Sequence, residues 1–266
     1  MPLGNAGLIK NVSASGILGM PSMLKVAPAG NASDSLIAAL PSLARWYKAN
    51  TIAVANGASV TSWLDSSTAG KNATVSNAYP TFATNATPNG KPAVSFNGAN
   101  QYIAGNGFAY TNGLCATTVF KYSSSGRIVC FNATGTDYND TDGGILILAQ
   151  SSNVSAYLEG TNTATPGGTA STNTWLIVTT KYEYVSSSNT NLVLRINGVE
   201  QARTNVGVAA TGTPILFNMG SDLTPIQQSF TACLIAETLL CVTNITDTQI
   251  HSVEQALGAK YGITVA

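Results

Sequence analysis

Short runs of alternating apolar and polar residues, separated by turn signals, make up most of the chain after about residue 36. A period of two is typical of β-strands, and Asn-Gly pairs at 89–90, 97–98 and 197–198 mark tight turns between them. The runs in which we expect strands are 51–65, 91–105, 114–126, 127–135, 143–153, 155–160, 174–185, 191–203, 214–222 and 230–243. Because no strand run is followed by a crossover helix, this pattern predicts an all-β fold, a two-sheet antiparallel jelly-roll sandwich.

Two segments have a helical pattern instead. Residues 33–50 form the first, which Pro41 interrupts. The second begins after Thr246, where Gln249 three positions later completes a capping box, and it ends before Gly262. Its apolar stripe consists of Ile250, Val253 and Leu257. We expect this C-terminal helix to cover one edge or face of the sandwich.

The first 35 residues follow neither periodicity for long, although they are apolar and interrupted by Gly and Pro. We therefore expect an extended N-terminal arm over 1–35, followed by one jelly-roll domain over 36–266. An apolar arm needs a surface to dock on, which is its own domain, a second copy in a homo-oligomer, or another protein. The residues expected to anchor it are Leu3, Leu8, Ile9, Ile17, Leu18, Met20, Met23 and Leu24.

The charge of the chain narrows the range of partners. Only 9% of the residues are charged, and 12 basic residues balance 12 acidic ones. Binding to nucleic acid needs a surplus of cations, so nucleic acid is not an expected partner. Asn, Ser and Thr together make up about 30% of the chain. This composition is typical of a surface that faces sugars or is exposed on a virion, and drift in composition is the alternative.

Two features of the sequence bear on the cellular location: the length of its apolar runs and the residues at its N-terminus. No run reaches the length of about 18 apolar residues that a membrane helix needs, so we expect no membrane insertion. The first residues do not resemble a secretory signal, which favours assembly in a cytoplasm. Four cysteines lie in apolar runs without a C-x-x-C pair, and we expect four free thiols: Cys115, Cys130, Cys233 and Cys241.

Several phrases in order resemble the LamG-like, concanavalin A-like jelly-roll family of lectins and glucanases. LARWYKAN is similar to the first strand of that family, and VTSWLDSSTAG to its W-x-D-x-S-like turn. NGKPAVSFNGANQYIAG resembles the strand that ends in an F-x-G turn, and TWLIVTTKYEYV with LVLRINGVEQA resembles the paired central strands. The closing strand contains Ala-Glu and precedes a helix that ends in K-Y-G; Cys233 departs from the glycine that is frequent there.

The resemblance implies a scaffold, because one fold supports many functions. The family occurs in glycan-binding modules, in adhesion domains and on tailed phages. One such module behind a short apolar arm resembles a virion surface protein of a tailed phage, either a head decoration or fibre or a tail appendage. The sequence thus favours a structural protein on the virion surface that binds other virion proteins through the arm and a glycan through the domain. A cell-displayed or secreted carbohydrate-binding module is the alternative, and an unusual glycosidase a weaker one.

Catalytic chemistry is not expected. A glycosidase of this fold needs two carboxylates projecting from one strand, but no glutamate has another carboxylate two or four positions away. The single histidine, His251, lies within the expected C-terminal helix, and no G-x-S-x-G turn occurs.

Two sets of residues are candidates for binding. Aromatic residues beside polar loops are candidates for stacking on sugar rings: Tyr79, Phe82, Tyr138 and Tyr157. Trp46, Trp63 and Trp175 are assigned to the core instead. Asp137, Asp140 and Asp142 supply hard oxygen ligands of the kind that suits Ca²⁺, although their spacing differs from an EF-hand, and a polar turn is the alternative. No other cofactor is expected. Glu237 is assigned to a local structural contact.

Overall fold

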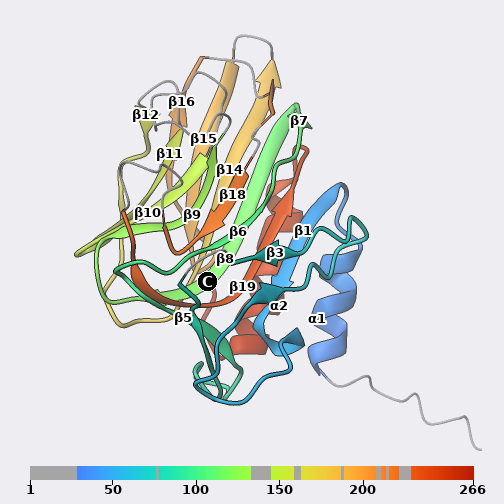
Figure 1. Cartoon of the computed structure of the whole chain (residues 1–266). Coiled ribbons are helices and arrows are strands. Elements are labelled where there is room, and N and C mark those ends of the chain that lie inside the picture. Colours follow the sequence, from blue (N-terminus) through green and yellow to red (C-terminus); the bar gives the residue numbers. More distant parts are fainter. Residues whose placement is uncertain are drawn as a thin grey trace, which may run out of the picture.

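The computed structural model describes residues 29–75, 78–132, 145–158, 163–186, 189–207, 211–213, 216–221 and 229–266. In this part of the chain, two antiparallel sheets are stacked face to face, and two helices lie against the outer side of one of them (Figure 1). The predicted class, a two-sheet antiparallel jelly-roll sandwich with a C-terminal helix, is confirmed.

Sheet A contains eight described strands. Its order is β16 (Val199–Asn205), β15 (Asn189–Ile196), β14 (Leu176–Ser186), β8 (Gly113–Tyr122), β19 (Ala232–Cys241), β5 (Ala93–Asn97) and β4 (Thr81–Ala83). The eighth strand, β1 (Leu43–Lys48), also pairs with β19 and continues into the short 3-10 helix η1 (Ala49–Thr51).

Sheet B contains nine described strands. Its order is β12 (Thr163–Ala164), β11 (Asn153–Leu158), β10 (Ile145–Gln150), β9 (Gly126–Asn132), β18 (Leu216–Met219), β6 (Ile103–Asn106), β3 (Ala73–Thr74) and β2 (Ser62–Trp63), while β13 (Gly168–Thr169) pairs with β11. A separate small ribbon joins β7 (Tyr110–Thr111) to β17 (Thr211–Gly212).

The main core lies between the two sheets. Phe120 projects into it from sheet A, and Phe131 and Phe217 project from sheet B, where their rings stack with centroids 5.1 Å apart. Side chains alternate along a strand, so the residues between these core positions face outward. The core therefore identifies which side chains each sheet presents on its outer face.

A second apolar layer lies between the outer face of sheet A and the helices α1 (Ala29–Ala38) and α2 (Asp247–Tyr261). The sheet side contributes Trp46 and Trp175 to this layer. Helix α2 contributes Val253, Leu257 and Tyr261. All three tryptophans are buried, Trp63 between the sheets and the other two under the helices, as predicted. Neither described helix is long and apolar enough to cross a membrane.

The ends of α2 match the sequence prediction. The Thr246 side chain accepts a hydrogen bond from the backbone N–H of Gln249, and the Gln249 side chain completes the capping box. Gly262 ends the helix in the left-handed conformation, with φ of 73°. A local sequence signal thus fixed both ends of this element.

The helix predicted over 33–50 is wrong in its second half, where the resemblance of LARWYKAN to a first strand is confirmed. The structure has α1 up to Ala38, a turn in which Ser42 has a positive φ of 53°, and then strand β1. Pro41 disfavours helix in the residue before it, which ends the helix. After the turn, pairing with β19 and burial of Trp46 and Tyr47 override the helical spacing.

The arm predicted over 1–35 overlaps the folded domain by a few residues. Residues 29–35 belong to α1, and Asp34 accepts hydrogen bonds from Lys48 at 3.0 Å and Lys260 at 2.9 Å. Residues 1–28, with all eight predicted anchor residues, lie outside the described residues. Any test of the arm should therefore cut before Ala29, because a cut after residue 35 removes most of α1 together with Asp34 and its two contacts.

Candidate functional site

The outer face of sheet B carries a continuous row of side chains across seven strands. Strand register places Asn218 of β18 opposite Ala104 of β6 on one side and opposite Cys130 of β9 on the other. The row continues through Leu146 of β10 to Tyr157 of β11. Its ends are Thr74 of β3 and Ala164 of β12. Directly opposed residues point to the same side of a sheet, so these side chains share one face.

Asn218 stands out in the middle of this row. Its neighbours in β18, Phe217 and Met219, belong to the core between the sheets, so the Asn218 amide projects to the outer face. The residue is only 1% exposed, yet neither its Oδ1 nor its Nδ2 atom has a hydrogen-bond partner among the described residues. A buried polar group without a partner costs about 1–3 kcal/mol, so this amide lowers stability unless water or another polar group reaches it.

A second amide on the same face has the same deficiency. Asn153 of β11 lies on the side of Tyr157, because Val154, Ala156 and Leu158 between and beside them belong to the core. The buried Oδ1 atom of Asn153 has no hydrogen-bond partner among the described residues. Four positions of a strand separate Asn153 from Tyr157, or about 13 Å. The outer face of sheet B thus offers unmet hydrogen-bonding groups at two places.

This combination suits a polar, uncharged ligand. An amide presents one acceptor and two donors, which can pair with hydroxyl groups in either role. Tyr157 is half-buried and adds an aromatic ring with a polar tip, and Leu146 and Cys130 make the centre of the row apolar. Cys130 and Leu146 are at most 1% exposed, so Tyr157 is the more accessible member of this part of the row.

Sequence reasoning assigned no role to Asn218. The alternation within 214–222 places Phe217 and Met219 on one face and Asn218 on the other, so its direction was readable from the sequence. Its burial and its lack of a partner depend on strands that are distant in the chain, and no local pattern contains that information.

The four predicted stacking aromatics do not form one platform. Tyr157 lies on the outer face of sheet B, as described above. Tyr79 is 41% exposed just before β4 of sheet A, and its carbonyl oxygen accepts a hydrogen bond from Gln101. Phe82 is buried in the core between the sheets, which corrects its assignment as a stacking residue. Phe82 takes the inward position of β4, between the half-buried Thr81 and Ala83. Tyr138 lies outside the described residues.

The predicted calcium ligands Asp137, Asp140 and Asp142 also lie outside the described residues, in the connection between β9 and β10 of sheet B. Among the residues that the structure describes, no group of His, Cys, Asp and Glu side chains is arranged to hold a metal ion. The calcium site stays a prediction from the sequence.

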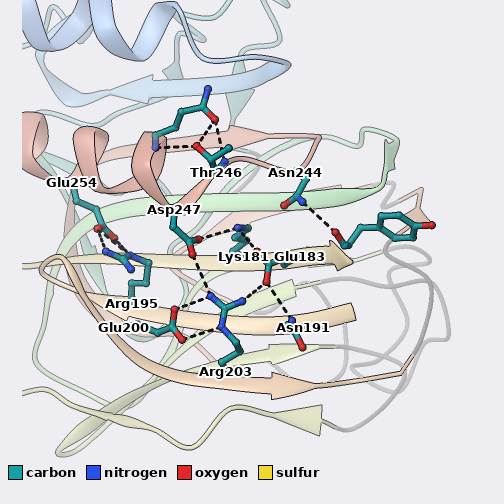
Figure 2. A network of polar contacts seen from close by, with 12 residues as sticks. Lys181, Glu183, Asn191, Arg195, Glu200, Arg203, Asn244, Thr246, Asp247 and Glu254 are labelled. Atoms are coloured by element: carbon teal, nitrogen blue, oxygen red, sulfur yellow. Dashed lines mark hydrogen bonds and ion pairs between the residues drawn. The ribbon is translucent and has the colours of Figure 1, made fainter. Parts of the chain in front are cut away.

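The densest group of charges lies on the outer face of sheet A, next to the start of α2 (Figure 2). Lys181 forms ion pairs with Glu183 at 2.6 Å and with Asp247 at 3.0 Å. Arg203 contacts Glu183, Glu200 and Asp247 in turn. Every charge in this cluster has an opposite partner within the protein, so the cluster fastens the N-terminus of α2 to the sheet.

This cluster predicts a loss of stability in acid. Burial raises the pKa of Glu183, but hydrogen bonds from Lys181 and Asn191 and the charges of Lys181 and Arg203 outweigh burial, and the pKa is lowered. A carboxyl group whose pKa is lowered by folding stabilises the protein above its unfolded pKa, and this contribution disappears as the pH falls through the folded pKa. We expect Glu183→Gln to lower the free energy of unfolding at pH 6 and to have little effect at pH 3, measured by urea denaturation. An effect of equal size at both pH values would contradict the assignment.

Glu237 forms the centre of a second polar network, which is buried. Its carboxylate accepts hydrogen bonds from Trp46 Nε1 at 2.5 Å, Lys260 Nζ at 2.7 Å and Tyr261 Oη at 2.5 Å. Burial and the charge of Glu237 hold the pKa of Tyr261 well above its usual value, so the phenol stays protonated. Glu237 has a structural role, but the expected local backbone or loop partner is wrong, because its partners are side chains of β1 and α2.

The chain was compared with known proteins. No protein-family model matches it, and no curated protein matches it in sequence. Solved structures do match in fold. The binding domain of botulinum neurotoxin serotype D aligns with 81% of this chain and 51% of its own, with a TM-score of 0.54 and 13% identity.

Two further solved structures were determined with sugar ligands. The ligand-binding domain of botulinum neurotoxin serotype D in complex with N-acetylneuraminic acid covers 86% of this chain and 52% of its own, with a TM-score of 0.55 and 13% identity. A Trypanosoma rangeli sialidase in complex with a difluoro-KDN ligand covers 90% of this chain and 39% of its own, with a TM-score of 0.58 and 13% identity. The chain thus spans about half the length of the neurotoxin domains and less than half the length of the sialidase. At this identity the likeness concerns the fold alone, which is a two-sheet β-sandwich of the jelly-roll type.

Proposed function

We propose that this protein is a non-enzymatic glycan-binding domain whose ligand lies on the outer face of sheet B. The observation that carries the proposal is the Asn218 amide, which is buried at the centre of that face without a described partner. A sugar that displaces what covers Asn218 would satisfy the donor and acceptor atoms of the amide, and Tyr157 in the same row would contact the sugar ring. The N-acetylneuraminic acid bound to the similar neurotoxin domain is a property of that protein, and it supports the choice of sugars as the ligand class.

A glycan array tests this function directly. The array should carry neutral, sialylated and bacterial polysaccharide glycans, and the probe is the labelled full-length chain. We expect reproducible binding to a small set of related glycans that free sugar competes away. A protein that binds no glycan on the array, at concentrations up to about 100 µM where weak lectins still bind, would contradict the proposal.

The proposal that the domain has no catalytic activity is supported by the positions of the four glutamates that the structure describes, Glu159 lying outside the described residues. Glu237 and Glu254 are fully buried and are engaged, the first with Trp46, Lys260 and Tyr261 and the second with Arg195. Glu183 and Glu200 form ion pairs with Arg203. His251 contacts Gln255 on the exposed side of α2. A glycosidase, the weaker alternative, needs an accessible acid beside a second carboxylate.

The finer proposal is that the domain is displayed on the surface of a tailed-phage virion, as a capsid decoration, fibre or tail appendage assembled in the host cytoplasm. It rests on the apolar composition of residues 1–28, which would bind other virion proteins or a second copy of the chain. A cell-displayed or secreted carbohydrate-binding module is the alternative, and it needs the same glycan site without the arm.

Removal of residues 1–28 separates these two alternatives. We expect the truncated protein to fold with an unchanged melting temperature, because α1 and its contacts through Asp34 are kept. We expect it to bind glycan as the full chain does and to lose co-sedimentation with its particle or oligomer. If the truncated protein assembles at full occupancy, the arm is not the anchor and the virion proposal fails. A matched cut after residue 35 should lower the melting temperature, because it removes Asp34.

A further inference from the structure

Two of the four cysteines are direct partners across neighbouring strands. Cys115 of β8 lies opposite Cys241 of β19 in the antiparallel ladder. Opposed residues in such a ladder have Cα atoms about 4.5 or 5.5 Å apart, and a disulfide needs about 4.4–6.8 Å. The next pair along, Ala116 and Leu240, belongs to the core between the sheets. Both thiols therefore point to the outer face of sheet A, toward each other.

The two thiols lie beneath the start of α2. They form one apolar cluster with Ile245 and Ile250, and each cysteine is at most 2% exposed. Burial raises the pKa of Cys241 to about 12, and burial and the neighbouring Cys241 raise the pKa of Cys115. The attacking species in disulfide exchange is the thiolate, so the folded protein keeps both groups unreactive.

The other two cysteines lie opposite residues other than cysteine on the neighbouring strands. Cys130 belongs to β9 of sheet B and lies opposite Asn218 and Leu146. Cys233 of β19 lies opposite Tyr122 of β8 and Phe96 of β5. Eight positions of the same strand separate Cys233 from Cys241, which corresponds to about 26 Å. The geometry thus selects one pair out of the six that four cysteines allow.

We propose that Cys115 and Cys241 form a disulfide when the chain folds in an oxidising medium, at the stage when β8 and β19 have paired and α2 has not yet covered them. The oxidant is a small disulfide of the glutathione class. One cysteine thiolate attacks it, forming a mixed disulfide and releasing one glutathione thiol. The second cysteine then attacks the mixed disulfide and releases the second glutathione. Two S–H bonds and one glutathione S–S bond are lost, one protein S–S bond forms, and the two electrons reduce the glutathione disulfide.

The consequence is a protein with two covalent forms. In a reducing cytoplasm it folds with four thiols, as the structure has it. In an oxidising compartment it acquires one cross-link between the two central strands of sheet A, which closes a long chain segment and stabilises the folded state. The redox state of the isolated protein therefore reports where it folded, independently of what it binds.

Refolding in a glutathione redox buffer tests this inference. The chain is unfolded in urea with reductant, diluted into oxidised and reduced glutathione, and quenched by alkylation. We expect a mass lower by two hydrogens, two alkylated cysteines after denaturation, and a peptide map that links Cys115 to Cys241. The oxidised protein should unfold at a higher urea concentration than the same sample after reduction.

Single substitutions provide the controls. Cys115→Ser and Cys241→Ser should each abolish the cross-link and the shift in urea midpoint, whereas Cys130→Ser and Cys233→Ser should retain both. Folded wild-type protein in the same buffer should stay reduced, because the thiols are covered. Four alkylatable thiols after oxidative refolding, or a cross-link that includes Cys130 or Cys233, would overturn the proposal. Equally fast oxidation of the folded protein would overturn the order of events in which α2 closes last.

Discussion

Glu237→Ala is expected to lower the free energy of unfolding by about 3–5 kcal/mol, the range for breaking a buried charge pair from one side. The substitution removes the acceptor of three buried donors, which belong to Trp46, Lys260 and Tyr261. These donors come from β1 and α2, whereas Glu237 belongs to β19. One carboxylate thus links the edge strand and the C-terminal helix to the centre of sheet A.

The size of the effect follows from the environment of Lys260. Burial lowers the pKa of Lys260, but the charges of Glu237 and Asp34 outweigh burial and raise it, so the amine is charged in the folded protein. The Lys260 side chain is 2% exposed. Without Glu237, the remaining partner of Lys260 among the described carboxylates is Asp34. Because the amine is buried, water does not readily replace the lost carboxylate, and a buried charge without a partner is costly.

Urea denaturation at pH 7 measures the difference in the free energy of unfolding between Glu237→Ala and the wild type. Glu200→Ala is the matched control, because Glu200 forms its ion pair with Arg203 at a half-exposed position. Such surface pairs contribute at most about 1 kcal/mol, so the control should unfold close to the wild type. If Glu237→Ala also unfolds within 1 kcal/mol of the wild type, the network is not a main source of stability.

The features predictable from sequence are those whose determinants are local. Alternation and Asn-Gly turns indicated a sandwich, and the capping box at Thr246 with Gly262 gave the ends of α2. The tryptophans were assigned to the core from their places in a familiar pattern, and their burial confirms it. In each case the signal lies within a few residues of the feature that it predicts.

The features that sequence missed depend on contacts between distant segments. The helical spacing of residues 43–48 missed the strand that they form by pairing with β19, which only the resemblance of LARWYKAN to a first strand indicated. Phe82 is inward because of the sheet to which β4 belongs, and its polar surroundings in the sequence suggested the opposite. The buried amide of Asn218 without a hydrogen-bond partner lies where β6, β18 and β9 meet, which no single run reveals.

Asn218→Leu is expected to abolish glycan binding and to leave stability unchanged or higher. Leucine has a similar size and carries no hydrogen-bonding group, so it removes the cost of a buried amide without a partner. A structural asparagine would give the reverse, because its loss would break hydrogen bonds that hold the fold. The same change at Asn191 is the control. That amide lies on the opposite sheet and donates to Glu183 at 3.3 Å, so Asn191→Leu should weaken the fold and keep binding.

Calorimetric titration with the glycan that gives the strongest array signal, paired with thermal melting of the same samples, tests the glycan site most directly. For Asn218→Leu we predict an affinity at least tenfold lower than that of the wild type, about 1.4 kcal/mol, together with an equal or higher melting temperature. Wild-type affinity in Asn218→Leu, or a loss of binding that comes only with a lower melting temperature, would contradict the assignment of the outer face of sheet B as the glycan site.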